Sequence, residues 1–143
     1  MTAAQLTPET MEQHVRDLGK AFKVRVLIKA ISPDRMVAQH LVGTAKKRII
    51  VPPIDSEEVY AGALHELGHC IDPMGMMWHQ MSKFAQMMGS PSTRADFAIQ
   101  LECERAAWKW AEHYALVWTD RMANVRRMTF ATYKRNARRL GIV

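Results

Sequence analysis

The stretch GALHELGHCIDP, Gly62–Pro73, limits the fold more than any other part of the chain. Residues four apart on an α-helix face the same way, so His65 and His69 can present both imidazoles to one Zn²⁺ at about 2.0–2.1 Å. Glu66 lies ~100° round the helix from His65, near enough to reach a water molecule at an open position of the ion. The pattern therefore predicts a helix carrying two metal ligands and a general base, with a third ligand elsewhere.

The flanking residues indicate that this helix is buried. Asp55 or Ser56 can cap its start, with Glu58 as a capping-box partner, and Pro73 favours an end near Ile71. Apolar side chains surround the motif, namely Ala61, Ala63, Leu64 and Leu67. Two buried histidines side by side need a partner, which favours a metal over a hydrogen-bonded pair of core histidines. Gly68 leaves room beside His69 for a close neighbour.

Three positions are candidates for the third ligand. Asp72 and Gly75 stand where the pattern H-E-x-x-H-x-x-G-x-x-H requires glycine and histidine, so that class of zinc enzyme is excluded. Asp72 itself shares the face of His65 but directly precedes a proline. His79 lies in a methionine-rich segment at 74–88, and a downstream histidine is a known third ligand in zinc peptidases. The last candidate is a glutamate in LECERAAWKWA.

Helical periodicity favours Glu104 over Glu102 as that glutamate. Glu104 is the only charge on an apolar stripe formed by Phe97, Leu101, Trp108, Ala111 and Ala115. Glu102 instead aligns with Arg105, Lys109 and Glu112, where salt bridges one turn apart explain it. A lone carboxylate on a buried face is costly unless it is paired or binds a metal. Glu104 is therefore the preferred ligand.

The motif HELGH, followed after 34 residues by ERAAWKWA, resembles the glutamate-ligand zinc peptidases, or gluzincins. It is similar in particular to the small ImmA/IrrE-like metallopeptidases and related phage and prophage enzymes. The resemblance covers roughly residues 20 to 115. It implies that His65, His69 and Glu104 bind zinc, that Glu66 is the base, and that the substrate is a regulatory or host-defence protein. One position differs, because Trp108 stands where many such enzymes have an aspartate that orients a histidine ligand.

The remaining segments predict an α+β fold in one domain over residues 1–143, which the resemblance implies is a minimal zincin-like domain. Thr7, Pro8 and Glu9 indicate the start of an N-terminal helix, with Met11, Val15, Leu18 and Phe22 as its buried stripe. Residues 23–31, 36–43 and 47–53 alternate or are β-branched, and short turns join them. They predict a three-stranded antiparallel meander. The H-E-x-x-H helix, the ligand helix at 94–118 and a basic C-terminal helix at about 120–139 follow.

The basic C-terminal helix carries the net charge. Seven basic residues and one acid give it +6, which equals the formal charge of the whole chain. It predicts binding of nucleic acid or an acidic partner through Arg126, Arg127, Lys134, Arg135, Arg138 and Arg139; the alternative is a solvated helix face. Its expected apolar stripe is Phe130, Tyr133, Ala137 and Leu140.

The rest of the composition indicates a location and excludes membrane functions. No apolar run is long enough to span a bilayer, and the N-terminus does not resemble a secretory signal. Cys70 and Cys103 cannot form a disulfide framework, so we expect a cytoplasmic protein with two buried thiols.

Stabilisation of an oxyanion needs a further side chain. His79 is the preferred helper if it is not a ligand, in a segment with Trp78 that could cover the site. His113 lies about 180° round the helix from Glu104 and is expected at the surface, while Tyr114 and His40 fit ordinary structural positions.

The sequence therefore predicts a zinc metalloendopeptidase that acts on a protein or peptide. The alternative is a non-catalytic, zinc-stabilised module that binds nucleic acid or protein through the basic helix. A metal-free interaction protein that uses the methionine-rich segment is a third interpretation.

Overall fold

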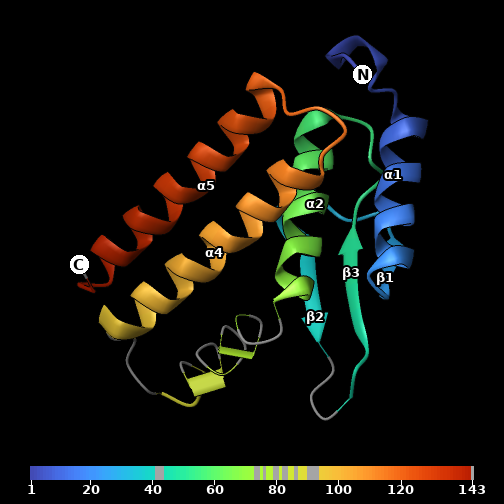
Figure 1. The fold of residues 1–143 in the computed structure, drawn as a ribbon. Helices are drawn as coiled ribbons and strands as arrows, with labels where there is room; N and C mark the ends of the chain where they lie inside the picture. Colours follow the sequence, from blue (N-terminus) through green and yellow to red (C-terminus); the bar gives the residue numbers. More distant parts are fainter. Residues whose placement is uncertain are drawn as a thin grey trace.

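The computed structural model describes residues 1–40, 44–72, 75, 77, 78, 81, 84, 85, 87–89 and 94–142. The fold is α+β, as predicted (Figure 1). The helices are α1 (Pro8–Ala21), α2 (Glu57–Ile71), α4 (Arg94–Tyr114) and α5 (Asp120–Arg139), with short 3-10 helices η1 (Ala3–Gln5) and η2 (Pro33–Arg35). The strands are β1 (Val24–Ile28), β2 (Val37–His40) and β3 (Lys47–Val51).

The sheet is mixed: the predicted antiparallel pairing of the second and third strands is confirmed, but the meander is wrong for the first strand. The strand order is β1-β3-β2, in which β3 runs parallel to β1 and antiparallel to β2. β3 carries the continuous apolar run Ile49–Val51, which suits a central strand whose two faces are both covered to a large extent. Ile49 and Val51 are completely buried. β3 therefore takes the centre, and β2 becomes an edge strand that packs against α2.

α1 forms as its sequence predicts. Thr7 caps it by accepting a hydrogen bond from the backbone N–H of Thr10 at 3.2 Å, and Pro8 occupies the first turn. Met11 and Val15 are buried in the core, while Leu18 and Phe22 are half-buried against it. α1 thereby covers one side of α2 and β1.

α2 is the central element of the molecule (Figure 1). It contacts α1, β2, β3, α4 and α5, and its residues from Val59 to Cys70 are buried apart from Glu66. Ser56 caps it by accepting from the Val59 N–H at 3.2 Å, and it ends at Ile71 as expected. The H-E-x-x-H motif therefore lies on the most enclosed helix, as its apolar flanks predict.

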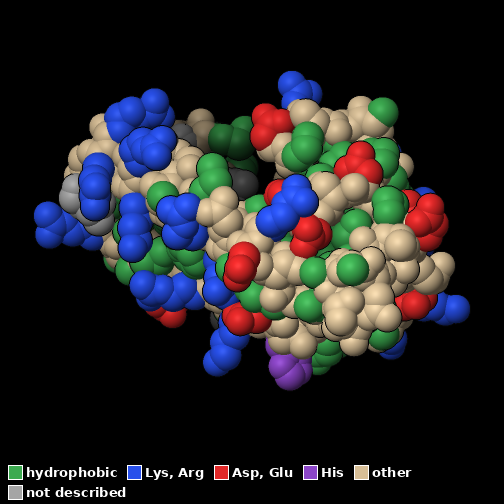
Figure 2. Space-filling view, turned by 90° about the horizontal axis from the view of Figure 1, so that it is seen from above, with side chains coloured by type: hydrophobic (Ala, Val, Ile, Leu, Met, Phe, Trp, Pro, Cys, Tyr) green, Lys and Arg blue, Asp and Glu red, His purple; other side chains and the backbone are tan. Residues whose placement is uncertain are grey.

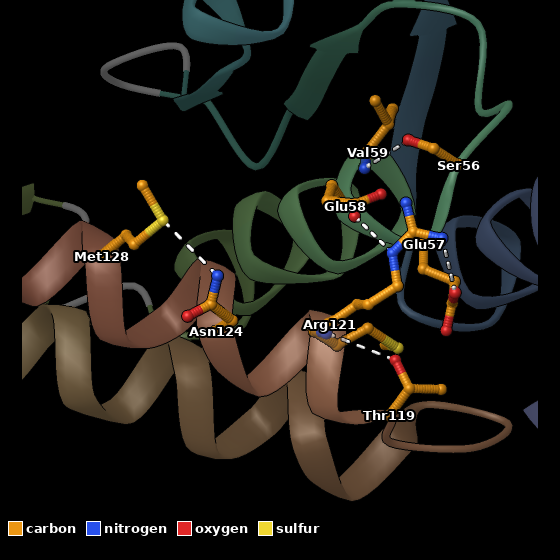
Figure 3. A network of polar contacts seen from close by, with 9 residues as sticks. Ser56, Glu57, Glu58, Val59, Thr119, Arg121, Asn124 and Met128 are labelled. Atoms are coloured by element: carbon orange, nitrogen blue, oxygen red, sulfur yellow. Dashed lines mark hydrogen bonds and ion pairs between the residues drawn. The ribbon is translucent and has the colours of Figure 1, made fainter.

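Hydrogen bonds from Arg121 connect α5 to the start of α2 (Figure 3). Nε of Arg121 donates to Glu58 at 2.7 Å, and its Nη1 donates to Glu57 at 3.3 Å. Ala137 is buried on the predicted apolar stripe, but Leu140 is 66% exposed because the helix ends one residue before it. None of the helices in the described ranges is long and apolar enough to span a membrane.

Candidate metal centre

Two helices bring three potential metal ligands together. Nε2 of His65 donates to Oε2 of Glu104 at 2.8 Å, and Nε2 of His69 lies 3.1 Å from the other carboxylate oxygen. One ligand atom from each residue lies within 4.8 Å of the other two. All three residues are buried, with 8% of each exposed. His65 and His69 come from α2 and Glu104 from α4, which is the set that the sequence favours.

The charges of this cluster are strongly coupled. Burial alone would lower the pKa of His65, but hydrogen bonding and attraction to Glu104 and Glu66 outweigh burial and raise it to about 9. Burial would raise the pKa of Glu104, yet its contacts with His65 and His69 hold that pKa well below the usual range. Without a metal, Glu104 is therefore ionised. It accepts a hydrogen bond from Nε2 of His65, and Nε2 of His69 lies beside its other oxygen.

The donor set fits Zn²⁺. Two imidazole nitrogens and one carboxylate oxygen are the ligands of a catalytic zinc site, which leaves a fourth position open. Ligand atoms about 2.0–2.1 Å from a common ion lie roughly 3.3 Å apart in a tetrahedron. The contacts of 2.8 and 3.1 Å to Glu104 are already close to that spacing. An ion would replace the protons that now occupy these contacts.

Gly68 allows the two ligand helices to approach. A Cβ atom at Gly68 would lie 2.6 Å from the carbonyl oxygen and 2.9 Å from Cα of Ala107 on α4. Those atoms belong to the backbone and cannot move aside without the helix. Ala107 is one turn after Glu104, so the absence of a side chain at Gly68 sets how near Glu104 comes to His65. The expectation that Gly68 makes room for a close neighbour is confirmed.

Glu66 is placed at the edge of the cluster. Its Oε1 lies 3.6 Å from Nδ1 of His65, which is longer than a hydrogen bond. It is the one residue of His65–His69 that is not fully buried. Glu66 and His65 line a cavity of about 460 Å³, whose other walls include Met36 before β2 and Val125 of α5. The carboxylate of Glu66 thus lies beside the candidate ligands at the wall of an open cavity.

The cavity continues into a longer groove. A neighbouring cavity of about 570 Å³ shares Asp34, Val125 and Thr129 with the first. It extends along α5 past Thr132 and Asn136. We call the two together the α5–η2 groove. Its walls are α5 on one side and the segment around η2 on the other.

Trp108 holds the ring of His65 by stacking. The two rings are nearly parallel, at 16°, with centroids 4.2 Å apart. Trp108 occupies the position where the resembling enzymes have an orienting aspartate, and it is 2% exposed. Its indole Nε1 is buried, and no hydrogen-bond partner for it is found in the described part of the chain. An apolar contact therefore fixes the imidazole that a carboxylate fixes elsewhere.

Two alternative third ligands, Asp72 and Glu102, are not part of the described cluster. Oδ1 of Asp72 accepts a hydrogen bond from the Gly75 N–H at 3.1 Å, so this carboxylate is engaged outside the cluster. Glu102 is exposed and accepts from Arg105 at 2.6 Å, as predicted for the wet face of α4. His79, predicted as a helper or ligand, lies outside the described residues.

The other candidate helpers lie elsewhere. His113 is exposed, as predicted. Tyr114 packs edge-on to Phe22 with ring centroids 5.3 Å apart, and Nε2 of His40 donates to the Thr44 carbonyl at 2.8 Å. Trp78 is 44% exposed. Among the described residues, these four side chains are not members of the cluster of candidate ligands.

Two neighbouring features complete the surroundings. Cys70 and Cys103 are buried, free thiols, as predicted, and burial raises the pKa of Cys70 to about 12. Tyr133 of α5 was expected only as part of an apolar stripe. Burial and the nearby charge of Glu104 raise its pKa, and its hydroxyl donates to Gln100. No local pattern in the sequence distinguishes Tyr133 from an ordinary stripe residue.

Comparisons of the chain with protein-family models, with curated proteins and with solved structures give no significant match.

Proposed function

We propose that the chain is a zinc-dependent metalloendopeptidase of the kind that the resemblance to ImmA/IrrE-like enzymes implies. One observation carries the proposal: the buried cluster of His65, His69 and Glu104 has Glu66 at its edge, facing a cavity. A site that only stabilised the fold would need no carboxylate beside an open space. Coordination by two imidazoles and one carboxylate suits a catalytic zinc.

Bound Zn²⁺ would supply Lewis acidity, which polarises the scissile carbonyl and makes water a better nucleophile. The chain's own residues divide the remaining work. Glu104 provides the negative charge that balances the ion, and Trp108 keeps His65 in place. Glu66 accepts the proton of the attacking water and returns it to the amine as the carbon–nitrogen bond breaks. Both movements of the proton take place at a carboxylate oxygen on the open side of the cluster.

The surroundings of Glu66 favour a peptide as the substrate. The α5–η2 groove is lined by residues from Glu66 at one end to Asn136 of α5, so an extended chain lying in it would pass Glu66. Met36, which lines it, directly precedes β2, whose pairing in the described sheet is with β3 alone. An edge strand offers backbone groups to which an extended peptide can add. A protein segment bound in this way would pass the cluster on its open side.

The test is the variant Glu66→Gln, which keeps the size of the side chain and removes the base. We expect it to bind zinc as the parent does, because Glu66 is not a ligand, and to lose turnover by at least about a hundredfold. Metal analysis and cleavage of a library of unstructured peptides measure the two properties. Glu102→Gln, an exposed glutamate on α4, is the matched control and should keep both. Cleavage by Glu66→Gln at the parental rate would show that Glu66 is not the base.

The presence of Trp108 in place of an orienting aspartate favours a second function, that of a non-catalytic binding module. In a non-catalytic module the zinc site only stabilises the fold, and no orienting carboxylate is required. Such a protein would bind zinc and cleave none of the peptides, with or without Glu66. The parent protein's turnover in the same assay therefore distinguishes the two functions.

A further inference from the structure

A second groove lies on the other side of α5. It has a volume of about 650 Å³ and runs between α4 and α5. Its lining cations come from both helices and are Arg105, Arg127, Lys134, Arg135 and Arg138. Within the part of the chain that the structure describes, its lining contains no acidic residue. We call it the cationic groove. The residues of α5 that line it are distinct from those that line the α5–η2 groove.

The structure separates the cations of α5 that serve the fold from those that face this groove. Arg121 binds Glu57 and Glu58, and Arg126 donates to Glu112 at 2.6 Å while lying over Trp118. The sequence predicts Arg126 as part of the binding surface of the basic helix, but its side chain is engaged by Glu112 and Trp118 and does not line the cationic groove. Lys134, Arg135 and Arg138 are exposed, and no ion pair to them is found in the described ranges. Figure 2 shows Lys and Arg side chains gathered on the side of the molecule where α4 and α5 lie.

The cations of α5 that line the cationic groove form a row along the helix. Arg127 and Arg138 are eleven residues apart, which is about 16 Å along a helix. Lys134 and Arg135 lie between them. A row of cations of this length faces several successive charges of an extended polyanion at once. Most of the row is arginine, whose planar fork matches phosphate oxygens.

The floor of the groove is apolar. Leu101, Phe130 and Ala131 line it between the cations, and Phe130 is half-buried against the core. Single-stranded nucleic acid combines a charged backbone with flat bases that stack on aromatic side chains. A peptide made of acidic residues alone, such as polyglutamate, supplies charges but no flat apolar groups. We propose that the cationic groove binds a single strand of nucleic acid, with phosphates on the cations and a base against Phe130.

The proposal is independent of the proposed peptidase activity. The two grooves use different residues of α5, and neither Glu66 nor a candidate zinc ligand lines the cationic groove. Loss of binding by a groove variant should therefore leave zinc content and peptide cleavage unchanged. Conversely, Glu66→Gln should bind nucleic acid as the parent does.

The experiment is fluorescence anisotropy of the full, zinc-loaded chain with a labelled oligothymidylate of about 20 nucleotides. The test variant combines Arg127→Gln, Lys134→Gln and Arg138→Gln. Its matched control combines Lys23→Gln, Arg25→Gln and Lys46→Gln, which removes the same charge from a second basic cavity at the ends of β1 and β3. All six side chains are exposed, so neither variant disturbs the core.

We expect the parent to bind the oligonucleotide with an affinity that falls as salt rises. A plot of log K against the logarithm of the salt concentration should have a slope of about −0.7 per phosphate contact. The test variant should lose at least about tenfold in affinity and about two units of that slope, since three contacts are removed. The control should change affinity by less than about threefold. An equal loss in the control would overturn the proposal, because the attraction would then come from overall charge. Absence of binding at about 50 mM salt, or tighter binding of polyglutamate or duplex DNA, would also overturn it.

Discussion

The pair formed by His65 and Glu104 is the residue-scale feature on which the account depends. A lone carboxylate on an apolar stripe was the signal in the sequence, and the structure places it between two imidazoles. The contact stabilises the protonated ring of His65 and the ionised form of Glu104 together. A metal ion must displace a proton from His65 to bind there. The protonation of the site and its zinc affinity are therefore linked.

This linkage predicts how zinc affinity changes with pH. The pKa of His65 is raised from 6.5 to about 9, so the folded chain holds this proton more tightly than the unfolded chain does. The resulting stabilisation of the metal-free fold is complete below pH 6.5 and is lost as pH rises through 9. The low pKa of Glu104 adds stabilisation that is present above its ordinary 4.5 and is lost in acid.

Zinc affinity should therefore rise about tenfold per pH unit between pH 7 and 9, since one proton is displaced. Competition with a chromophoric chelator at several pH values measures this. If His65 titrated at its ordinary pKa, affinity would instead level off just above pH 7. A plateau there would contradict the coupling between His65 and Glu104.

At the scale of elements, the site depends on how closely α2 approaches α4. A methyl group at Gly68 would collide with the backbone of Ala107, whereas one at Gly62 would meet only the end of the Met36 side chain. Both glycines are in the interior of the same helix. Replacing a helical glycine by alanine favours the helix by about 1 kcal/mol, so the two positions differ only in what the new methyl group meets.

The pair Gly68→Ala and Gly62→Ala tests this packing. Gly68→Ala should lower the free energy of unfolding by about 1–3 kcal/mol and weaken zinc binding, because α4 must move away and carry Glu104 with it. Gly62→Ala should be neutral or slightly stabilising. Urea unfolding and zinc titration of both variants measure the effect. Equal zinc affinities in the two variants would show that the approach of α4 does not set the site.

The elements themselves could be predicted from the sequence more fully than their arrangement. Thr7, Ser56 and the apolar periodicities identify the helices, because caps and stripes are local signals. The order of the strands is not local. Short connections suggested that neighbours in sequence pair, and the burial of Ile49 and Val51 instead places β3 in the centre.

In the candidate site too, local features could be predicted from the sequence and contacts between helices could not. Glu104 was favoured because burying an unpaired charge is costly wherever the helix packs. The stacking of Trp108 on His65 requires the relative rotation of two helices, which periodicity does not contain. The proximity of Tyr133 to Glu104 requires the position of α5 as well. Contacts between elements distant in sequence were therefore the part that could not be predicted.

At the scale of the whole molecule, α5 gives the chain two separate surfaces. One side lines the groove that begins at Glu66, and the other lines the cationic groove. The sequence located the charge of this helix but not the use of each cation, since Arg121 and Arg126 bind acids of α2 and α4. The proposed peptidase site and the proposed nucleic-acid site thus use one helix without sharing its residues.

We propose that His65, His69 and Glu104 together hold one zinc ion. The most direct test is the metal content of protein purified without chelator, for the parent, for Glu104→Gln and for the exposed control Glu102→Gln. We expect about one zinc per chain in the parent and in the control, and at least a tenfold weaker affinity in Glu104→Gln. A parent that contains no stoichiometric zinc and does not bind it when titrated, or a Glu104→Gln variant that retains it in full, would contradict the account.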